Sequence, residues 1–271
     1  MTERDQPVLF GPYRVVRELG VSRAGPRWIA INERTGENRT VYRVGSSRDH
    51  VERRRLLAAL ERAGSVSHAH LLTVDQFSLD NTGNVWAVTA YRGNQEGLVT
   101  LPELADAKGG RLSPIETERA LEQILEAVAF AHGQGLHHGP IDPEEILIDR
   151  HGSVWIELYA LPRLLDGLDA FNEFLVRDEV RSVVAIGYKL LTGLDAEEPR
   201  VPAARMFKKL DRAWDRWFDR GLDASGGFDS AGEAFAALPS RGGVLADSPV
   251  VATRPVRRVL SRFRRSSVVD R

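Results

Sequence analysis

The sequence predicts an α+β protein with a small strand-rich part followed by a larger, mainly helical part. Three observations lead to this prediction. The first ninety residues contain five short runs rich in Val, Ile, Tyr and Trp, with one helical segment among them. The remainder places apolar residues at helical spacing and is interrupted by one hairpin. Hydrophobic residues at 42% and charged residues at 28% are typical of an ordered globular chain.

The strand-rich part is expected to be one antiparallel sheet with a helix inserted after its third strand. Asp49-x-x-Glu52 is a capping-box signature that opens this helix, which runs through Leu60. A turn at Asp80–Gly83 joins the last two strands as a hairpin. The five predicted strands are Tyr13–Leu19, Arg27–Asn32, Arg39–Val44, Leu71–Ser78 and Asn84–Tyr91.

The helical part is delimited by capping signals. Ser113-Pro114-Ile115-Glu116 opens a helix with a capping Ser, Pro at the first helical position and Glu three residues on. The remaining predicted elements are a hairpin of Ile146–Ile148 and Val154–Leu158, helices from about Asp178 to Gly193 and over Met206–Phe218, and a short helix capped by Ser230. The aromatic residues of the Met206–Phe218 segment are expected to pack in the core.

Composition excludes several classes of protein. There are no cysteines, which removes disulfides and thiol nucleophiles and suits a reducing cytoplasm. No window offers eighteen uncharged apolar residues, so no membrane span is predicted, and no secretory signal follows Met1–Gln6. The net charge of −1 conceals an uneven distribution, because Arg254–Arg271 holds seven arginines and one aspartate.

Six short motifs follow one another along the chain in a recognisable order. They are Leu19-Gly20-x-Ser22-x-x-Gly25, Thr40-Val41-Tyr42-Arg43, His68-Ala69-His70-Leu71, Gly135–Ile148, Glu179–Gly193 and Gly227–Ala231. Their order and spacing resemble those of protein kinases, in particular bacterial serine/threonine protein kinases. The resemblance covers Phe10 to Leu238. It implies a bilobal fold, with a small five-stranded antiparallel lobe carrying one helix and a larger mainly helical lobe.

The resemblance also implies a domain division. We expect an N-terminal extension at 1–9, a small kinase-like lobe at 10–92, a large helical lobe at 93–239 and a flexible basic C-terminal tail at 240–271. The tail boundary rests on a change of composition to Gly, Ser, Pro and Arg after Pro239.

The catalytic motifs of the family are degenerate in this chain. The resemblance assigns their positions to Arg43, His138, Pro140, Asp142, Glu145 and Leu158. Pro140 stands where the family has its general base, and losing such a base costs ~10²–10⁴ in rate. Leu158 stands where an aspartate anchors magnesium, whereas Glu145, at the metal-binding asparagine position, can still ligate Mg²⁺ through oxygen.

Further departures concern charge partners. Arg43 replaces the strand-three lysine and is not an equivalent point charge for phosphate. Arg53, Arg54 or Arg55 falls where the partner glutamate of that lysine is expected. No Ala-Pro-Glu motif occurs between Ala160 and Glu179, and Asp142 reverses the charge of a catalytic-loop lysine.

A vestigial nucleotide cleft is implied by the same resemblance. Its residues are Gly20, Ser22, Gly25, Arg43, Thr89 and Tyr91. We expect no cofactor, with weak or metal-independent ATP binding as the alternative. No metal site is predicted, although His132, His137, His138 and Asp142 contain ligand types for zinc.

The C-terminal tail offers a separate hypothesis. On a helix, Arg254–Arg265 places four apolar residues on one face with arginines around it. Such a segment can bind an anionic membrane surface or an acidic partner, while nucleic acid is not favoured. Ser266 and Ser267 follow two arginines and suit a basophilic kinase. The simpler reading is a solvated tail.

The sequence as a whole therefore predicts a cytoplasmic pseudokinase that is not an enzyme and acts as a regulatory or scaffolding binding module. Its protein partners are not identified by the residues. Two alternatives stay open: a divergent ATP-binding serine/threonine kinase-like transferase with an altered active site, and a surface adaptor that binds an anionic membrane or nucleic acid through its basic tail.

Overall fold

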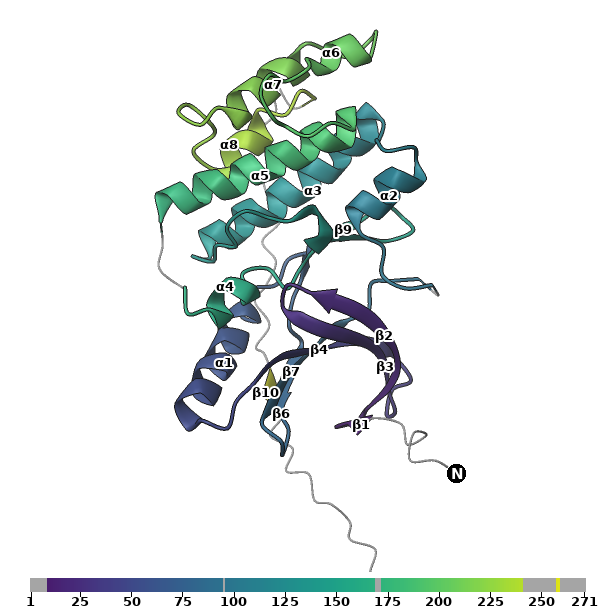
Figure 1. Ribbon diagram of the computed structural model, residues 1–271, viewed down its shortest axis with the longest axis vertical. Coiled ribbons are helices and arrows are strands. Elements are labelled where there is room, and N and C mark those ends of the chain that lie inside the picture. Colours follow the sequence, from purple (N-terminus) through teal and green to yellow (C-terminus); the bar gives the residue numbers. More distant parts are fainter. Residues whose placement is uncertain (1–8, 95, 169–171, 241–256, 259–271) are drawn as a thin grey trace, which may run out of the picture. The chain divides into compact units, whose positions relative to one another are not determined.

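The structure, a computed structural model, describes residues 9–94, 96–168, 172–240 and 257–258. The chain divides into two compact units (Figure 1). Unit 1 comprises Met1–Ser65, Thr73–Tyr91 and Arg254–Arg271, and unit 2 comprises Val66–Leu72 and Arg92–Thr253. The short segment Val66–Leu72 thus belongs with the helical unit, although strands of unit 1 precede and follow it in the sequence.

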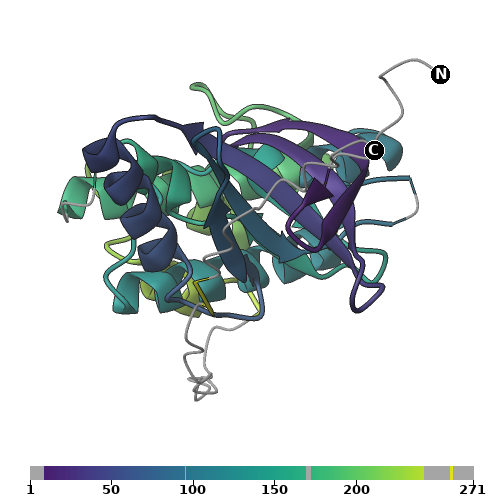
Figure 2. The ribbon, with the colours of Figure 1, turned by 90° about the horizontal axis from the view of Figure 1, so that it is seen from below.

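Unit 1 is built on one sheet with the strand order β1-β2-β3-β4-β7-β6-β10. The strands are β1 (Leu9–Phe10), β2 (Tyr13–Ser22), β3 (Gly25–Asn32), β4 (Asn38–Ser46), β6 (Gln76–Leu79), β7 (Asn84–Ala90) and β10 (Arg257–Arg258). The five strands β2, β3, β4, β7 and β6 pair antiparallel, as predicted for the small lobe. Helix α1 (His50–Ala63) lies against this sheet (Figures 1 and 2).

Side chains that alternate along the strands, and so point to one face of the sheet, form the core of unit 1. Tyr13, Ala30, Val41 and Val88 form a buried cluster, against which the half-buried Trp86 packs. The side chain of Asp49 caps α1 by accepting hydrogen bonds from the backbone N–H groups of the helix's first turn. Asp49 is thereby confirmed as the cap, but the predicted box is half formed, because the N–H of Asp49 donates to Ser47 and Glu52 pairs with Arg55.

Unit 2 is mainly helical. Its elements are α2 (Leu101–Ala107), α3 (Pro114–Gly133), the 3-10 turn η1 (Pro143–Glu145), α4 (Leu161–Leu165), α5 (Glu173–Thr192), α6 (Ala203–Met206), α7 (Ala213–Leu222), α8 (Ala231–Ala236) and a three-stranded sheet of β5 (Leu71–Leu72), β9 (Val154–Glu157) and β8 (Ile146–Ile148). The long helices α3 and α5 lie side by side (Figure 1). A Cβ atom on Gly187 of α5 would lie 2.7 Å from Leu121 of α3, so glycine permits their close approach.

The aromatic residues after α6 pack in the core, as predicted. Trp214, Trp217, Phe218 and Phe228 are each at most 3% exposed and stack on one another. The indole N–H of Trp217 donates to the carbonyl of Ala234 at 3.0 Å, which satisfies its polar atom inside the core.

Three predicted boundaries are wrong. The strand predicted at Leu71–Ser78 is two strands in different sheets, because Leu71 and Leu72 are both buried and pair with β9 while β6 pairs with β7. Helix α5 begins at Glu173 rather than near Asp178, because Asn172 caps it. The helix predicted over Met206–Phe218 is interrupted, since α6 ends at Met206 and α7 begins only at Ala213, after a turn in which Asp211 accepts the N–H of Ala213.

Two further findings concern the termini and membranes. Among the described residues, no helix is both long enough and apolar enough to cross a lipid bilayer. The predicted amphipathic tail lies outside the described residues except for Arg257–Arg258. These two residues form β10, parallel to Gln76–Phe77, so a helix is wrong for them.

Candidate functional site

The strongest candidate site in unit 2 comprises the loop from His138 to Glu145 and the turn Leu158–Ala160. The loop lies between α3 and β8 and ends in the 3-10 turn η1, while the Leu158–Ala160 turn follows β9. These segments hold the positions that the kinase resemblance assigns to catalysis.

Glu179 of α5 ties the loop to the helical core. Its side chain is fully buried, and Oε2 accepts hydrogen bonds from the backbone N–H groups of His138 and Gly139, both at 2.9 Å. Its Oε1 accepts a hydrogen bond from the hydroxyl of Tyr159. One carboxylate on a helix thus joins the start of the loop to the turn that follows β9.

His138 makes a second connection between the same two segments. The N–H of Ala160 donates to its Nδ1 at 3.0 Å, so Nδ1 carries no proton and the hydrogen lies on Nε2. Nε2 then donates to Oε2 of Glu145 at 3.1 Å. The same Glu145 oxygen accepts the N–H of Asp142 at 3.0 Å. Both ends of the loop are therefore held by buried acceptors.

The electrostatics of this buried network match its hydrogen bonds. Burial would raise the pKa of Glu179, but the nearby His132, whose Nε2 lies 3.4 Å from Glu179 Oε2, leads the interactions that lower it. Burial, followed by the charge of Glu179, raises the pKa of the Tyr159 hydroxyl well above its usual value. Glu179 is thus the ionised acceptor, and Tyr159 remains a neutral donor.

The turn after β9 has unusual backbone geometry. Leu158 and Ala160 have φ angles of 46° and 63°, in the left-handed region that non-glycine residues rarely adopt. Each such residue costs on the order of 1 kcal/mol, so the surrounding packing must hold the turn in place. Leu158 is 1% exposed, which places an apolar side chain where the family's magnesium aspartate is expected.

The acids of the loop differ in their accessibility. Pro140 is exposed and Leu158 is buried, and neither has a polar side-chain atom. Glu145 is 5% exposed and engaged with His138, whereas Asp142 is exposed. Oδ1 of Asp142 accepts the N–H of Glu144 at 3.0 Å. Asp142 and Glu144 are therefore the loop carboxylates that a ligand can reach, and Asp142 is the one at a position that the kinase resemblance assigns to catalysis.

The described residues do not fit a bound magnesium ion. No group of three or more His, Asp or Glu side chains among them is arranged to hold a metal. Oε2 of Glu145 already accepts hydrogen bonds from His138 and from the N–H of Asp142. The sequence left open that Glu145 ligates Mg²⁺, and its geometry in the structure gives that role no support.

In unit 1, the segment that resembles the glycine-rich loop is a tight hairpin. Ser22 pairs with Gly25, which leaves a two-residue turn. Ser22 Oγ accepts the N–H of Ala24 at 3.2 Å and donates to the carbonyl of Gly25. A Cβ at Gly25 would lie 2.3 Å from the carbonyl oxygen of Arg43, so this glycine serves close strand packing. Gly20, with φ +82°, lies at the irregularity between Glu18 and Val21.

The other residues assigned to nucleotide binding have structural contacts within unit 1. The guanidinium of Arg43 lies 6.0 Å from the ring centroid of Trp28, and no acid pairs with it among the described residues. Thr89 is fully buried and its hydroxyl donates to the carbonyl of Ala90. Burial raises the pKa of Tyr91, which is half-buried beside Arg17.

Sequence reasoning gave no role in the buried network to three of its residues, namely Glu179, Tyr159 and His132. A signal for Glu179 was present, because it lies four residues before Val183 on the apolar face of α5, where an acid needs buried partners. Tyr159 and His132 gave no comparable signal. Their role follows from the approach of α3, α5 and β9.

The comparisons with known proteins point to one superfamily. No protein-family model matches the chain. CBL-interacting protein kinase 1 of Oryza sativa subsp. japonica is 29% identical over 172 residues, which are 59% of this chain and 35% of the relative. CBL-interacting serine/threonine-protein kinase 18 of Arabidopsis thaliana is 24% identical over 164 residues, which are 59% and 30% of the two chains. The chain thus spans about a third of the length of these relatives.

A solved structure supports the same fold. The kinase domain of PknI from Mycobacterium tuberculosis matches with a TM-score of 0.65 and 20% sequence identity, covering 88% of this chain and 98% of that chain. The resemblance to the protein kinase-like superfamily and the predicted α+β fold are confirmed by these findings.

The prediction that the chain is not an enzyme is contradicted. Its sequence relatives and the matching structure are named as protein kinases, which points to an enzyme. The prediction treated Pro140 and Leu158 as decisive for the whole chain. That inference assumed that no other acid can serve, whereas the described loop is firmly anchored and exposes Asp142.

Proposed function

We propose that this chain, whose relatives and fold are those of the protein kinase-like superfamily, is a divergent serine/threonine kinase-like phosphotransferase with an altered site. The observation that carries the proposal is the anchoring of the loop from His138 to Glu145. Glu179 holds its first residues and His138 holds its last, so Asp142 is presented on a fixed backbone. Pre-set positioning is the main requirement of phosphoryl transfer.

Asp142 is the residue we propose for the proton. Transfer of the γ-phosphoryl group of ATP to a hydroxyl requires a group that accepts the hydroxyl proton. The side chain of Asp142 caps η1, and its Oδ1 accepts the N–H of Glu144 at 3.0 Å. Its carboxylate is exposed, so the acceptor hydroxyl would donate to it from the solvent side.

Nucleotide binding is proposed to be weak and independent of magnesium. The support is the poor fit of the described acids to a metal ion, together with the positive charge at Arg43. A thermal-shift titration with ATP, with magnesium and with EDTA, tests this. A ligand at about 100 times its Kd stabilises a fold by about 2.7 kcal/mol, so the two titrations should coincide if the proposal holds.

Transfer itself is tested with labelled ATP and a mixed set of serine- and threonine-containing peptides. We expect Asp142→Asn to lower the rate by ~10²–10⁴, because asparagine keeps the cap of η1 but accepts no proton. The matched control is Asp149→Asn, which alters an acid at a turn outside the loop. Equal rates in wild type and Asp142→Asn, or no transfer by wild type to any acceptor, would reject the proposal.

A second candidate function is regulation through a protein partner, the binding role read from the sequence. The sequence relatives are named as CBL-interacting kinases, which favours protein partners in general. We propose a cytoplasmic setting on the absence of cysteine. Binding of an anionic membrane or an acidic partner by Arg254–Arg271 stays a prediction, tested by deleting that segment and raising the salt concentration.

A further inference from the structure

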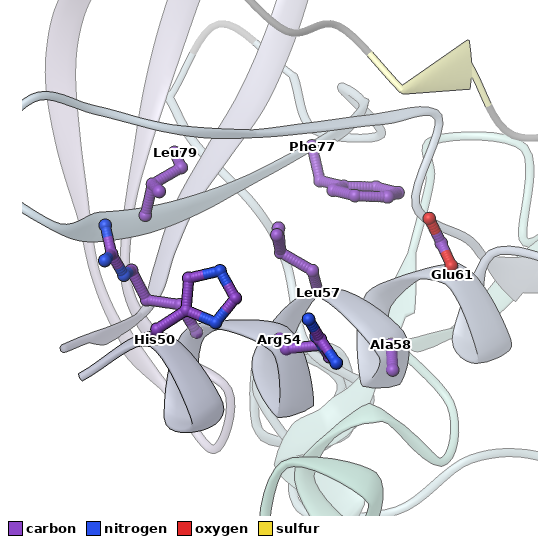
Figure 3. Close-up of a pocket in the computed structure, with 8 residues that line it drawn as sticks. His50, Arg54, Leu57, Ala58, Glu61, Phe77 and Leu79 are labelled. Atoms are coloured by element: carbon purple, nitrogen blue, oxygen red, sulfur yellow. The ribbon is translucent and has the colours of Figure 1, made fainter. Parts of the chain in front are cut away.

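The sheet of unit 1 has one face against helix α1. Figure 3 shows Phe77 of β6 on the side of the sheet where Leu57 of α1 lies. The strand register pairs Phe77 with Ala87 of β7, and Ala87 with Tyr42 of β4. Side chains of paired residues point to the same side of a sheet, so Tyr42 lies on the face that α1 contacts.

The opposite face carries two tryptophans and an arginine. Side chains alternate along a strand, so Arg43, which follows Tyr42, points away from α1. Its partner in the register is Trp86 of β7. Trp28 of β3 pairs with Val41, two residues before Arg43, and therefore lies on the same face. These three residues are called the Trp28–Arg43–Trp86 cluster below.

The two tryptophan rings of the cluster are fixed at an angle to each other. Trp86 packs on the buried cluster of unit 1, and its indole N–H donates to Oδ2 of Asp80 at 2.9 Å. The ring of Trp28 lies beside it, with the centroids 5.6 Å apart and the ring planes at 52°. Both rings are half-buried, so part of each is open to solvent. The cluster therefore offers aromatic surface in a set orientation.

Two donors of the cluster are not used within the described part of the chain. The indole N–H of Trp28 makes no hydrogen bond there, unlike that of Trp86. The guanidinium of Arg43 is exposed and lies 6.0 Å from the centroid of the Trp28 ring, with neither an ion pair nor a hydrogen bond to a described residue. Tryptophan is common at interfaces because its N–H can find a partner there. Both donors are thus available to a ligand.

The surroundings of the cluster give it a charge polarity. Glu18 of β2 pairs with Trp28 in the register, so its exposed carboxylate lies on the same face, across β3 from β4. Val21 is 71% exposed and pairs with Pro26, two residues before Trp28. The face therefore combines apolar surface with a positive group on the β4 side and a negative group on the β2 side.

The place of the cluster in the sheet limits how a partner can bind. Strand β3 lies between β2 and β4, and β4 lies between β3 and β7. A ligand therefore cannot add a strand here and must bind through side chains. A polyproline II segment meets this condition, because it makes no internal hydrogen bonds, its carbonyls are free to accept, and its proline rings pack on aromatic side chains.

We infer that the Trp28–Arg43–Trp86 cluster binds a proline-rich segment of a partner protein in the polyproline II conformation. Prolines of the segment would pack on the two tryptophan rings, and the indole N–H of Trp28 would donate to one of its carbonyls. An acidic residue of the segment would pair with Arg43, and a basic one with Glu18. This surface goes beyond the proposed phosphotransferase function and does not depend on it.

The probe is a fluorescein-labelled oligoproline peptide with an aspartate at one end and a lysine at the other. A second peptide keeps both charged ends and replaces the prolines by alanine. Binding to the full chain is followed by fluorescence anisotropy. We expect the oligoproline peptide to bind with a Kd below about 1 mM and the alanine peptide at least about tenfold more weakly, because proline sets the bound conformation in advance. Equal affinities, or no binding of the oligoproline peptide, would overturn the inference.

Matched substitutions locate the binding. Arg43→Gln should weaken the oligoproline peptide about tenfold, whereas Arg34→Gln removes the same charge from the exposed turn between β3 and β4 and should change it less than about twofold. Trp28→Phe keeps an aromatic ring but removes the N–H, and should weaken the peptide about fivefold. Circular dichroism checks that each variant is folded. Unchanged affinity in both Arg43→Gln and Trp28→Phe would reject the site.

An NMR titration of the nitrogen-labelled chain gives an independent readout. The indole N–H signal that is absent in Trp28→Phe should shift when the peptide is added to wild type, because that donor gains an acceptor. The indole signal of Trp155, a residue of unit 2, serves as the control and should not shift. A shift at Trp155 without one at Trp28 would place the peptide elsewhere and contradict the inference.

Competing occupants are measured with the same variants. A single-stranded oligonucleotide and ATP are titrated against wild type and Trp28→Phe, since nucleobases also stack on tryptophan. If either binds more tightly than the peptide and loses affinity in Trp28→Phe, the face is a nucleotide-stacking surface and the inference is wrong. Light scattering tests a second copy of the chain, and a dimer that dissociates in Arg43→Gln would likewise reject the proline-rich partner. Equal losses of peptide affinity in Arg43→Gln and Arg34→Gln would show only a general effect of charge and would also reject it.

Discussion

Two carboxylates hold turns in the two units of this protein, and they do so over very different distances along the chain. In unit 1, Asp80 accepts hydrogen bonds from Thr82, Asn84 and Trp86, all within six residues. In unit 2, Glu179 accepts the N–H groups of residues forty and forty-one positions away. The hydrogen bonds of Asp80 form within a single hairpin, whereas those of Glu179 form only when distant segments of the chain fold together.

The two carboxylates also differ in their surroundings. Asp80 is partly exposed, and although burial would raise its pKa, hydrogen bonds from Thr82, Trp86 and Asn84 lower it to about 2. Glu179 is fully buried, so water cannot replace a lost donor or acceptor. The comparison predicts that the distant, buried carboxylate matters far more for stability than the local one.

The largest expected effect is that of Glu179→Ala. It leaves the N–H groups of His138 and Gly139 and the hydroxyl of Tyr159 unpaired in the interior, which should cost about 3–5 kcal/mol in the free energy of unfolding. Urea denaturation followed by circular dichroism measures it. The exposed Glu173→Ala on the same helix should cost less than about 0.5 kcal/mol. A loss below about 1 kcal/mol for Glu179→Ala would contradict the comparison.

Asp80→Ala should have the next largest effect. It removes the acceptor of the β6–β7 turn, but water reaches the partly exposed donors and replaces some of the hydrogen bonds. We expect a loss of about 2 kcal/mol in the free energy of unfolding, measured by the same denaturation. A loss equal to that of Glu179→Ala would show that neither burial nor the distance along the chain to the bonded partners determines how much a carboxylate stabilises the fold.

Tyr159→Phe removes one of the hydrogen-bond donors to Glu179 and leaves the others in place. The ring should keep its packing beside His138, and only the hydroxyl is removed, so we expect a loss of about 1 kcal/mol. A spectroscopic titration adds an independent readout. Because burial and Glu179 raise the pKa of Tyr159, this tyrosine should ionise at a higher pH than an ordinary phenol. Ionisation at an ordinary phenol pKa would contradict the buried hydrogen bond.

The smallest expected effect is a change in acid sensitivity. The folded pKa of Asp80, about 2, lies below its ordinary value of 3.8. Asp80 therefore stabilises the fold above about pH 4, and this stabilisation is lost as pH falls towards 2. Melting temperatures of wild type and Asp80→Asn should converge across that window, since asparagine does not titrate. A constant difference between the two would reject the assignment.

Sequence reasoning identified the elements whose signals are local. The capping box at Ser113 depends on residues three positions apart, and the structure contains both of its bonds. Boxes at Asp142–Glu145 and at Thr100–Glu103 were overlooked, although their signals have the same form. Helix starts could thus be predicted wherever the capping residues were noticed.

The errors occurred where a segment's partner is distant. Leu71–Leu72 and Gln76–Leu79 lie in one run that was read as a single strand. They join different sheets because Leu71–Leu72 pairs with β9 and Gln76–Leu79 pairs with β7. The candidate site shows the same limit. The positions of Pro140, Asp142 and Leu158 could be read from motifs, whereas their anchoring by Glu179 could not.

The amino-acid sequence by itself determined the order of strands and helices, the local caps and turns, and the loss of polar side chains at Pro140 and Leu158. These follow from steric preference and from hydrogen bonds between near neighbours. Only the tertiary structure decided that Glu179 would hold the start of the loop from His138 to Glu145. Such pairings depend on which surfaces are buried together, and burial is decided by the packing of the whole chain.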